Sequence, residues 1–257
     1  SYIVISLIAS TLFITTLALF YSATGTVNMA ELAERIPELH SGVRTGFSLL
    51  LIAVFGIKAG IFPLFFWLPD SYPTAPNAVT AIFAGLLTKV GVYAIIRTQL
   101  LLFPMDAQQG KLLLVVAGCT MVAGVLGALA NDDLQRILSF HIISHIGYMI
   151  MGLGLFTLAG VAGAVFYVVH HIVVKTALFL VAGLIERKAG SDRLSRLGGM
   201  VRSAPMIAVL YALPALSIAG LPPFSGFVAK FALVGAAIEA EQWAIVVVAL
   251  SVSLLTM

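Results

Sequence analysis

Hydrophobic residues are concentrated in eight long stretches separated by short polar segments. The stretches cover residues 2–22, 45–66, 76–101, 111–130, 137–156, 161–185, 204–238 and 243–257. A helix of about 20 apolar residues spans the hydrocarbon core of a bilayer, and most of these stretches reach that length. The pattern therefore predicts an all-α, polytopic membrane helix bundle in which each stretch is one span.

Two of these stretches contain residues that interrupt a helix. The seventh stretch is too long for a simple span, and its core SIAGLPPFSGFVAKF places Pro222 and Pro223 near mid-depth. The second stretch has a milder version, GIKAGIFPLFFWLP, with Pro63 inside it. Proline removes a backbone donor and breaks a helix, although proline and glycine are also commoner in membrane helices generally.

The spacing of the two interrupted spans suggests an internal duplication. Broken helices at corresponding places in two halves are typical of transporters built from inverted repeats. We therefore expect residues 1–103 to be the end of a first repeat and 111–257 to be a second repeat, incomplete at its C-terminus. Both chain ends lie inside apolar segments. On that basis, residues 1–257 are expected to be one membrane domain and an internal fragment of a longer polypeptide.

Composition narrows the functional classes. The chain is 61% hydrophobic and 10% charged, whereas soluble domains carry about 25% charged residues. No basic stripe interleaved with aromatics lies outside the apolar stretches, so we expect no nucleic-acid partner. The single cysteine, Cys119, cannot form an internal disulfide. No phosphate loop, paired nucleophile and base, or haem or cluster ligation pattern is present, so we expect neither enzymatic activity nor a cofactor.

Four lysines lie near the middles of apolar stretches. They are Lys58, Lys89, Lys175 and Lys230, and no Asp or Glu lies at comparable depth in those stretches. A lysine at the bilayer centre costs about 2.5–3.5 kcal/mol on insertion scales. Desolvation favours the neutral amine form of a lysine, whereas a nearby carboxylate favours its ammonium form. A row of such lysines can therefore take up and release protons in turn, as a proton relay does.

Histidines accompany these lysines. His171 precedes Lys175 by four residues, so both lie on one helical face. His141 and His145 have the same spacing, but no further ligand completes a metal site in that helix, and we expect no metal. The proposed relay set is Lys58, Lys89, His141, His171, Lys175 and Lys230. The alternatives are a packing role for His141, a carbonyl-capping role for Lys89, and snorkelling of Lys175 toward the interface.

Loop charges predict the orientation. The loop between the sixth and seventh stretches holds a dense basic cluster: Arg187, Lys188, Arg193, Arg196 and Arg202. The positive-inside rule places that loop in the cytoplasm. Alternation of spans then puts the 23–44 loop outside and gives six Lys and Arg residues inside against four outside.

The linking stretch between Lys58 and Lys89 carries a recognisable motif. Lys58 precedes Pro63, Trp67, Leu68 and Pro69, followed by Ala75, Pro76, Lys89, Gly91, Tyr93 and Arg97. This arrangement resembles the antiporter-like membrane subunits shared by respiratory complex I, membrane hydrogenases and Mrp-type sodium/proton antiporters. The stretches NDDLQRILSFHIISHIGY, YVVHHIVVKTALFLVAGLIE and GLPPFSGFVAKFALVGAAIE also resemble parts of this family, so the resemblance covers the whole chain.

Within this family, the sequence PPFSGFVAKF most resembles that of the D-type subunits of Mrp antiporters. The resemblance implies a subunit of about 14 helices whose sixth helix is our first span. It also implies a cytoplasmic basic loop and a glutamate, on an earlier helix, that pairs with the first lysine. No position in this chain supplies that glutamate.

The expected function is that of a proton-translocating subunit of a multi-subunit Na⁺/H⁺ antiporter in a bacterial plasma membrane. Its expected partners are other membrane subunits, H⁺ and Na⁺, and the lipid bilayer. One alternative is a proton-pumping membrane subunit of a complex I-like NADH:quinone oxidoreductase or a membrane hydrogenase. Another is a membrane scaffold whose lysines pair structurally with partner subunits.

Overall fold

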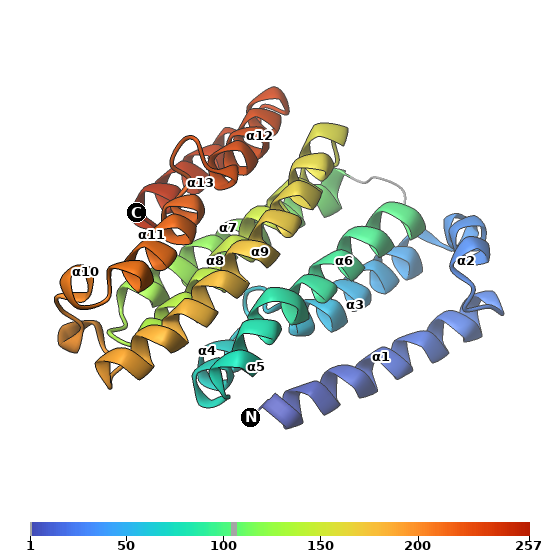
Figure 1. Cartoon of the computed structure of the whole chain (residues 1–257). Helices are drawn as coiled ribbons and strands as arrows, with labels where there is room; N and C mark the ends of the chain where they lie inside the picture. The colour runs from blue at the N-terminus through green and yellow to red at the C-terminus, as the bar shows by residue number, and fades with distance from the viewer. Residues whose placement is uncertain (1, 104–106) are drawn as a thin grey trace.

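The computed structural model describes residues 2–103 and 107–257, and within these ranges the chain is helical with no β-strand (Figure 1). Six helices are long and apolar enough to cross a membrane, which confirms the predicted all-α membrane bundle. The elements are α1 (Tyr2–Thr24), α2 (Met29–Arg35), η1 (Ile36–Glu38), α3 (Ser41–Ala59), α4 (Trp67–Ser71), η2 (Tyr72–Thr74), α5 (Asn77–Ile82), η3 (Phe83–Leu87), α6 (Thr88–Leu102), α7 (Ala107–Leu129), α8 (Leu134–Gly154), α9 (Leu158–Ala189), η4 (Leu194–Arg196), α10 (Met200–Ser203), α11 (Pro205–Ala219), α12 (Ser225–Glu239) and α13 (Trp243–Leu255).

Helix breaks occur in both stretches where the sequence predicts them. The 204–238 stretch divides into α11 and α12, with Pro222 and Pro223 in the turn between them. The 45–66 stretch does not form one continuous helix, because α3, which is itself one of the six candidate spans, ends at Ala59, and Gly60 adopts a left-handed conformation (φ 79°). Pro63 therefore lies in an irregular segment between α3 and α4 rather than inside a helix. Each break contains a cis prolyl peptide bond, at Phe62–Pro63 and Pro222–Pro223.

The 76–101 stretch contains an irregularity that periodicity does not reveal. Its helix runs from Asn77 to Leu102, but η3 in its middle is a π-helical turn. A π turn shifts the hydrogen-bond register of the helix from i+4 to i+5. The Tyr72 hydroxyl donates to a carbonyl of this turn, that of Phe83, at 3.2 Å.

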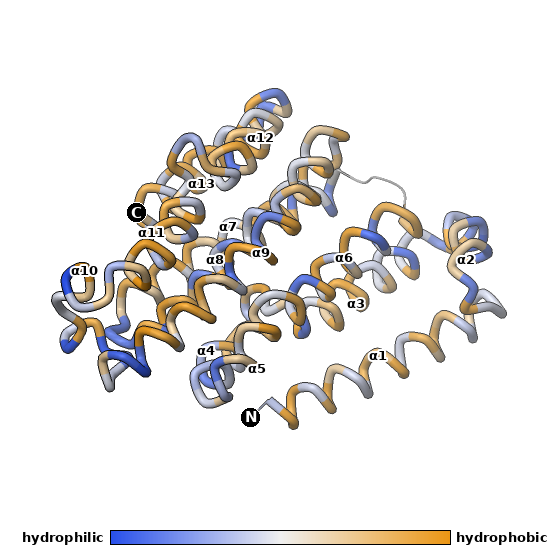
Figure 2. The backbone as a smooth tube through the Cα atoms, in the orientation of Figure 1, coloured by the Kyte–Doolittle hydropathy of each residue, from blue (hydrophilic) through white to orange (hydrophobic). Residues whose placement is uncertain are grey.

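The centre of the bundle is α8. Every residue from Ile142 to Gly154 is buried, and α8 packs against α7 on one side and α9 on the other. By contrast, α1 exposes a long row of apolar side chains and packs mainly against α3 (Figures 1 and 2). Many large hydrophobic side chains are exposed, and hydrophobic residues occur along all the long helices (Figure 2), as expected for a bundle surrounded by lipid or by other apolar helices.

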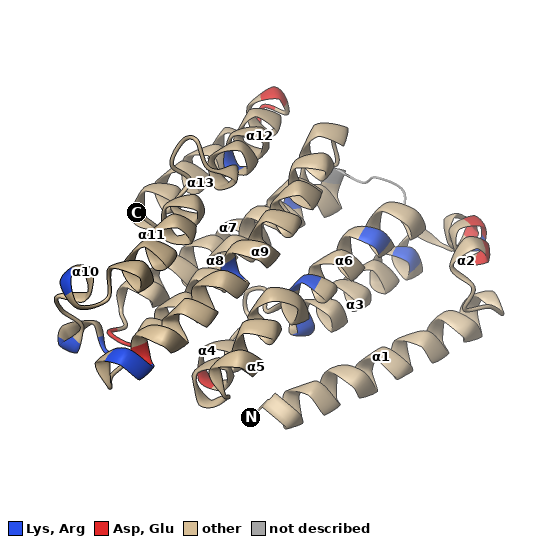
Figure 3. Ribbon diagram, viewed as in Figure 1, with Lys and Arg blue, Asp and Glu red and all other residues tan. Residues whose placement is uncertain are grey.

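Acidic residues lie at the two ends of the bundle, whereas Lys and Arg occur both at the ends and along the helices between them (Figure 3). At one end, the Ser195 hydroxyl donates to Asp132 at 2.6 Å, which joins the basic loop to the turn before α8. At the same end Arg136 pairs with Asp70 at 2.6 Å, which brings the α4 segment to this group of loops. These contacts bring together loops that the alternation of spans places on the same side of the membrane. The cytoplasmic location of that side stays a prediction.

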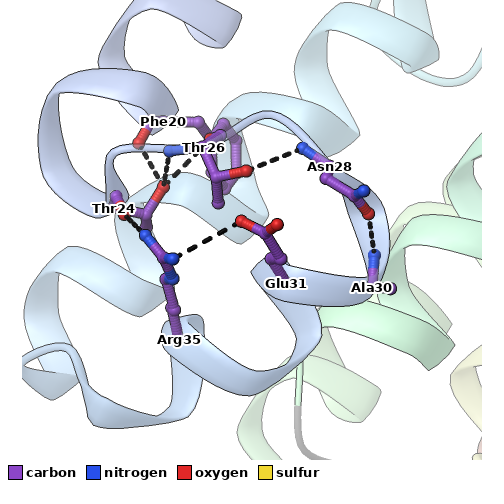
Figure 4. A network of polar contacts seen from close by, with 7 residues as sticks. All are labelled: Phe20, Thr24, Thr26, Asn28, Ala30, Glu31 and Arg35. Carbon is purple, nitrogen blue, oxygen red and sulfur yellow. Dashed lines mark hydrogen bonds and ion pairs between the residues drawn. The ribbon is translucent and has the colours of Figure 1, made fainter.

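The opposite end holds the short helix α2, fixed by a polar network (Figure 4). Asn28 caps α2 by accepting from the Ala30 N–H at 2.9 Å, and Arg35 donates to the Thr24 carbonyl at 2.5 Å. Arg35 also pairs with Glu31 at 3.4 Å. The network closes the turn between α1 and α3, so that these two helices run in opposite directions.

Close approach of α7 and α8 gives a test of the packing. A Cβ atom added at Gly124 meets the Ser144 backbone nitrogen at 2.3 Å, whereas one added at Gly235 on α12 meets nothing within 4 Å. We expect Gly124→Ala to lower the free energy of unfolding by about 1–3 kcal/mol because α7 must move away from α8. Thermal melting of the detergent-solubilised full-length protein measures this, with Gly235→Ala as the control. Equal melting temperatures for the two variants would contradict the packing.

Candidate functional site

Lys58 lies at the first helix break. It is in the last turn of α3, is half-buried, and donates from Nζ to the Ser6 hydroxyl of α1 at 2.8 Å. The two ion pairs within 4 Å among the described residues are Arg35–Glu31 and Arg136–Asp70. Neither involves a mid-span lysine, so the carboxylate expected to pair with Lys58 stays a prediction.

Lys89 is placed by the π turn. It lies in the first turn of α6 with 2% of its surface exposed, and its Nζ donates to the Ala84 carbonyl, which belongs to η3. Gly91 brings α6 directly against the end of α3, since a Cβ there would lie 2.7 Å from the Ala59 nitrogen. Lys89 is thus buried beside the helix that carries Lys58.

Lys175 and His171 lie on the same face of α9, as their spacing predicts. Both are fully buried, and Lys175 donates from Nζ to the Leu138 carbonyl of α8 at 3.2 Å. This contact excludes snorkelling of Lys175 toward the interface in this structure. The η3 turn that bonds Lys89 packs directly against α9 beside Lys175, since a Cβ at Gly85 would clash with Thr176 Oγ1.

His145 occupies the centre of the site on α8. Its ring lies 5.2 Å from that of His171, and its Nδ1 is hydrogen-bonded to the Tyr167 hydroxyl at 2.5 Å. His141, one turn away, has its ring 6.3 Å from that of His145. The His145 ring thus links α8 to α9 at the depth of His171.

Two tyrosines continue from His145 toward the second helix break. Tyr148 and Tyr167 stack with ring centroids 5.6 Å apart, and the Lys230 ammonium lies 5.5 Å from the Tyr148 ring centroid. An ammonium over an aromatic ring is attracted by the ring's electrostatic field. The tyrosine pair therefore separates His145 from Lys230 with groups that tolerate a positive charge.

Lys230 is anchored at the broken helix. Its Nζ donates to the Ala219 carbonyl at 2.9 Å and to the Ser253 hydroxyl of α13 at 3.0 Å. Ala219 is the last residue of α11, and the C-terminal end of a helix carries partial negative charge. The break therefore provides a site for a cation in a region without carboxylates.

The buried basic row, which we define as Lys89, His171, Lys175, His145 and Lys230, crosses α6, α9, α8 and α12. Several buried polar atoms beside it have no protein partner among the described residues: Thr88 Oγ1, Ser144 Oγ, His145 Nε2 and both ring nitrogens of His171. Buried polar groups of this kind usually bond ordered water. The site therefore has free donors and acceptors through which water can connect its members.

Part of this site lies outside the set chosen from sequence. That set included His141, whereas His145 makes the contacts to His171 and Tyr167. His170, the residue before His171, is hydrogen-bonded to Ser225 of α12 at 2.9 Å. Helical spacing could have indicated these residues, because 167, 171 and 175 fall on one helix face, and 141, 145 and 148 fall on another.

No group of three or more His, Cys, Asp or Glu side chains close enough to hold a metal ion occurs among the described residues. The basic row is instead suited to proton exchange, because each member has a basic nitrogen that can bind and release a proton. In this structure Lys89, Lys175 and Lys230 all bond backbone carbonyls, so the geometry also satisfies the carbonyl-capping alternative.

Comparison with known proteins adds independent information. Residues 1–256 match the profile of the family described as "NADH:quinone oxidoreductase/Mrp antiporter, TM". The chain is 50% identical over its whole length to the D subunit of the Na(+)/H(+) antiporter of Alkalihalophilus pseudofirmus. It is 39% identical, also over its whole length, to the protein of the same name from Bacillus subtilis. It covers 52% of each relative, so it spans about half the length of the curated proteins it matches.

Solved structures give the same result. A chain of the Mrp complex from Dietzia sp. superimposes with a TM-score of 0.94 at 42% identity, covering 99% of this chain and 47% of that one. A chain of the membrane-bound sulfane sulfur reductase, an archaeal respiratory membrane complex, gives 0.93 at 30% identity, covering 99% and 53%. Respiratory complex I from Thermus thermophilus with bound NADH gives 0.89 at 26% identity, covering 99% and 55%.

These matches confirm the resemblance drawn from the lysine and proline motifs. They extend over the residues of the basic row and over both helix breaks. The chain belongs to the NADH:quinone oxidoreductase/Mrp antiporter family of membrane subunits.

Proposed function

We propose that this chain is the central part of a proton-translocating subunit of a multi-subunit Na⁺/H⁺ antiporter. Protons move near the bilayer midplane through Lys58, on the first-repeat side, and then through the buried basic row, which ends at Lys230. The chain itself acts as part of a transporter. The relatives named as D subunits of Na(+)/H(+) antiporters support this choice.

The observation that carries the proposal is the continuity of buried ionisable groups across four helices. Lys89 bonds η3, which packs against α9 beside Lys175. The His171 ring lies 5.2 Å from that of His145, and the Tyr148 ring contacts both His145 and Lys230. When one lysine binds a proton, its positive charge disfavours the charged form of the next lysine. Protonation at one end of the row therefore favours proton release from the neighbouring group. A scaffold has no need of such a succession.

The same row serves a redox-driven pump, which is the second candidate function. The family includes NADH:quinone oxidoreductases, and the structural matches include two respiratory complexes. In that case electron transfer in partner subunits supplies the energy and the chemistry of this chain is unchanged. The higher identity to antiporter relatives favours the first candidate.

The proposed setting is a bacterial plasma membrane, with other membrane subunits and lipid around the bundle. The extensive apolar exposure of α1 fits coverage by such neighbours. We further propose that residues 1–103 and 111–257 belong to two inverted repeats of one longer polypeptide. The two helix breaks, each associated with a lysine, support this division.

Substitution of Lys230 separates a relay from a scaffold. Lys230→Arg retains a positive donor for the Ala219 carbonyl, but arginine does not release its proton in proteins. In the complete complex we expect Lys230→Arg and Lys230→Ala both to lower Na⁺-dependent proton transport by about a hundredfold or more. Lys111→Ala, at an exposed lysine, is the control. Wild-type transport by Lys230→Arg in an assembled complex would exclude proton release from this position.

The central placement of His145 predicts an order of sensitivity between two histidines. His145→Ala removes the ring between His171 and Tyr167, whereas His141→Ala removes a ring at the margin of the site. We expect transport to fall at least about tenfold further in His145→Ala than in His141→Ala. Vesicle assays on complexes of equal subunit content provide the comparison. A larger loss in His141→Ala would favour the residue selected from sequence.

The antiporter and redox candidates differ in their source of energy. In everted vesicles containing the complete complex, an antiporter collapses a pre-formed pH gradient when Na⁺ is added, with no oxidation of NADH. We expect this result, measured by a pH-sensitive dye together with NADH absorbance. Proton movement that requires NADH oxidation and ignores Na⁺ would instead identify the redox-driven pump.

A further inference from the structure

A polar cluster joins three helices at the end of the bundle that carries the basic loop. Glu186, in the last turns of α9, accepts at Oε2 from Asn77 Nδ2 and from Gln135 Nε2, each at 3.0 Å. Gln135 Nε2 also donates to Asn77 Oδ1 at 2.8 Å. Asn77 begins α5 and Gln135 lies in the first turn of α8. The cluster thus connects the helix of Lys89 with the two helices that hold the centre of the basic row.

Glu186 is distinctive among the acidic residues. Within the six described helices long enough to cross a membrane, it is the only carboxylate. It is half-buried, whereas the neighbouring Arg187 and Lys188 are exposed. Both amide donors bond the same oxygen, so Oε1 makes no hydrogen bond to a described residue. Glu186 therefore has one oxygen held by the protein and one available to exchange a proton.

The cluster is built by close packing. A Cβ added at Gly183, one turn before Glu186, would lie 2.7 Å from Asn77 Cβ. Only a glycine at that position allows α5 to approach α9 so closely. The approach brings the Asn77 amide within reach of the carboxylate.

A polar route leads from this cluster to the basic row. Gln135 is only 5% exposed, and its Oε1 is a buried acceptor with no partner among the described residues. Three residues further along α8, the Leu138 carbonyl accepts from Lys175. Along α9, Glu186 follows Lys175 by eleven residues, which corresponds to about 16 Å of helix. Gln135 and the Leu138 carbonyl therefore lie between a half-exposed carboxylate and a fully buried lysine.

We infer that Glu186, held by Asn77 and Gln135, is the group through which Lys175 exchanges protons with the aqueous phase at the basic-loop end. This inference rests on the proposed relay. The carboxylate takes a proton from water, and the carboxylic acid passes it inward through ordered water beside Gln135. The neutral Lys175 amine accepts it and becomes an ammonium, while Glu186 returns to the carboxylate. The reverse sequence releases a proton to the same side.

The two amides have a defined role in this exchange. Their N–H donors hold the carboxylate in place, and the buried Gln135 oxygen accepts a hydrogen bond from the protonated acid or from water. If Glu186 only clamped the helices together, its hydrogen bonds would matter, but its ability to gain and lose a proton would not. Variants that preserve one property and remove the other distinguish the two.

The test uses the complete complex in vesicles and measures the maximal rate of Na⁺-dependent proton transport together with complex yield. Glu186→Gln removes the titrating group and preserves the side-chain shape, and we expect about a hundredfold loss of maximal rate at normal yield. Glu186→Asp restores a carboxylate and is expected to recover at least about a tenth of the wild-type rate. Asn77→Ala weakens the clamp and keeps the carboxylate, so it should cost less than Glu186→Gln. Glu239→Gln, at an exposed carboxylate, is the control.

Two outcomes would overturn the inference while leaving the relay intact. One is a wild-type rate in Glu186→Gln alongside an inactive Lys230→Ala. The other is a loss in Glu186→Gln that Asn77→Ala matches and that follows a reduced yield of complex. Wild-type rates in both Glu186→Gln and Lys230→Ala would instead contradict the relay itself, and the inference with it.

Discussion

Lysines buried in a helix bundle, with no carboxylate within 4 Å of them among the described residues, are the constraint on which this structure depends. An ammonium group in an apolar interior is costly unless other dipoles replace water around it. The chain supplies these dipoles from its own backbone, through the Ala84, Leu138 and Ala219 carbonyls. Two of these carbonyls lie where a helix is irregular or ends, in the π turn of η3 and at the end of α11. The irregularities therefore place backbone acceptors beside Lys89 and Lys230.

Carbonyl dipoles and carboxylates have different consequences for proton transfer. A carboxylate beside a lysine fixes it in the charged form, whereas a carbonyl stabilises the ammonium without neutralising it. A row stabilised by carbonyls and aromatic rings keeps its repulsion between neighbours, and that repulsion allows one protonation to affect the next. Lys58 is the exception in its contacts, since it bonds the Ser6 hydroxyl and is only half-buried. Lys58 is also the one lysine of the four that is expected to pair with a carboxylate.

Small residues set the distances between the helices. Gly91 allows α6 to meet the end of α3, and Gly183 allows α5 to meet α9. In a membrane there is little hydrophobic drive between helices, so association depends on close packing and on polar contacts. The Asn77–Gln135–Glu186 cluster combines both at one end of the bundle. The positions of the lysines relative to each other thus follow from glycines that carry no chemistry themselves.

The sequence by itself determined the membrane-spanning helices, both helix breaks and the four deep lysines, because hydropathy, proline and charge are local properties. The spacing of residues 171 and 175 also predicted their shared face. It did not predict the π turn, the end of α3 at Ala59, or the choice between His141 and His145. These depend on which neighbouring helix each face meets, and a helix face has no fixed partner until the bundle packs. Only the tertiary structure placed His145 against His171 and brought Glu186 to Asn77 and Gln135, because those contacts join residues far apart in the chain.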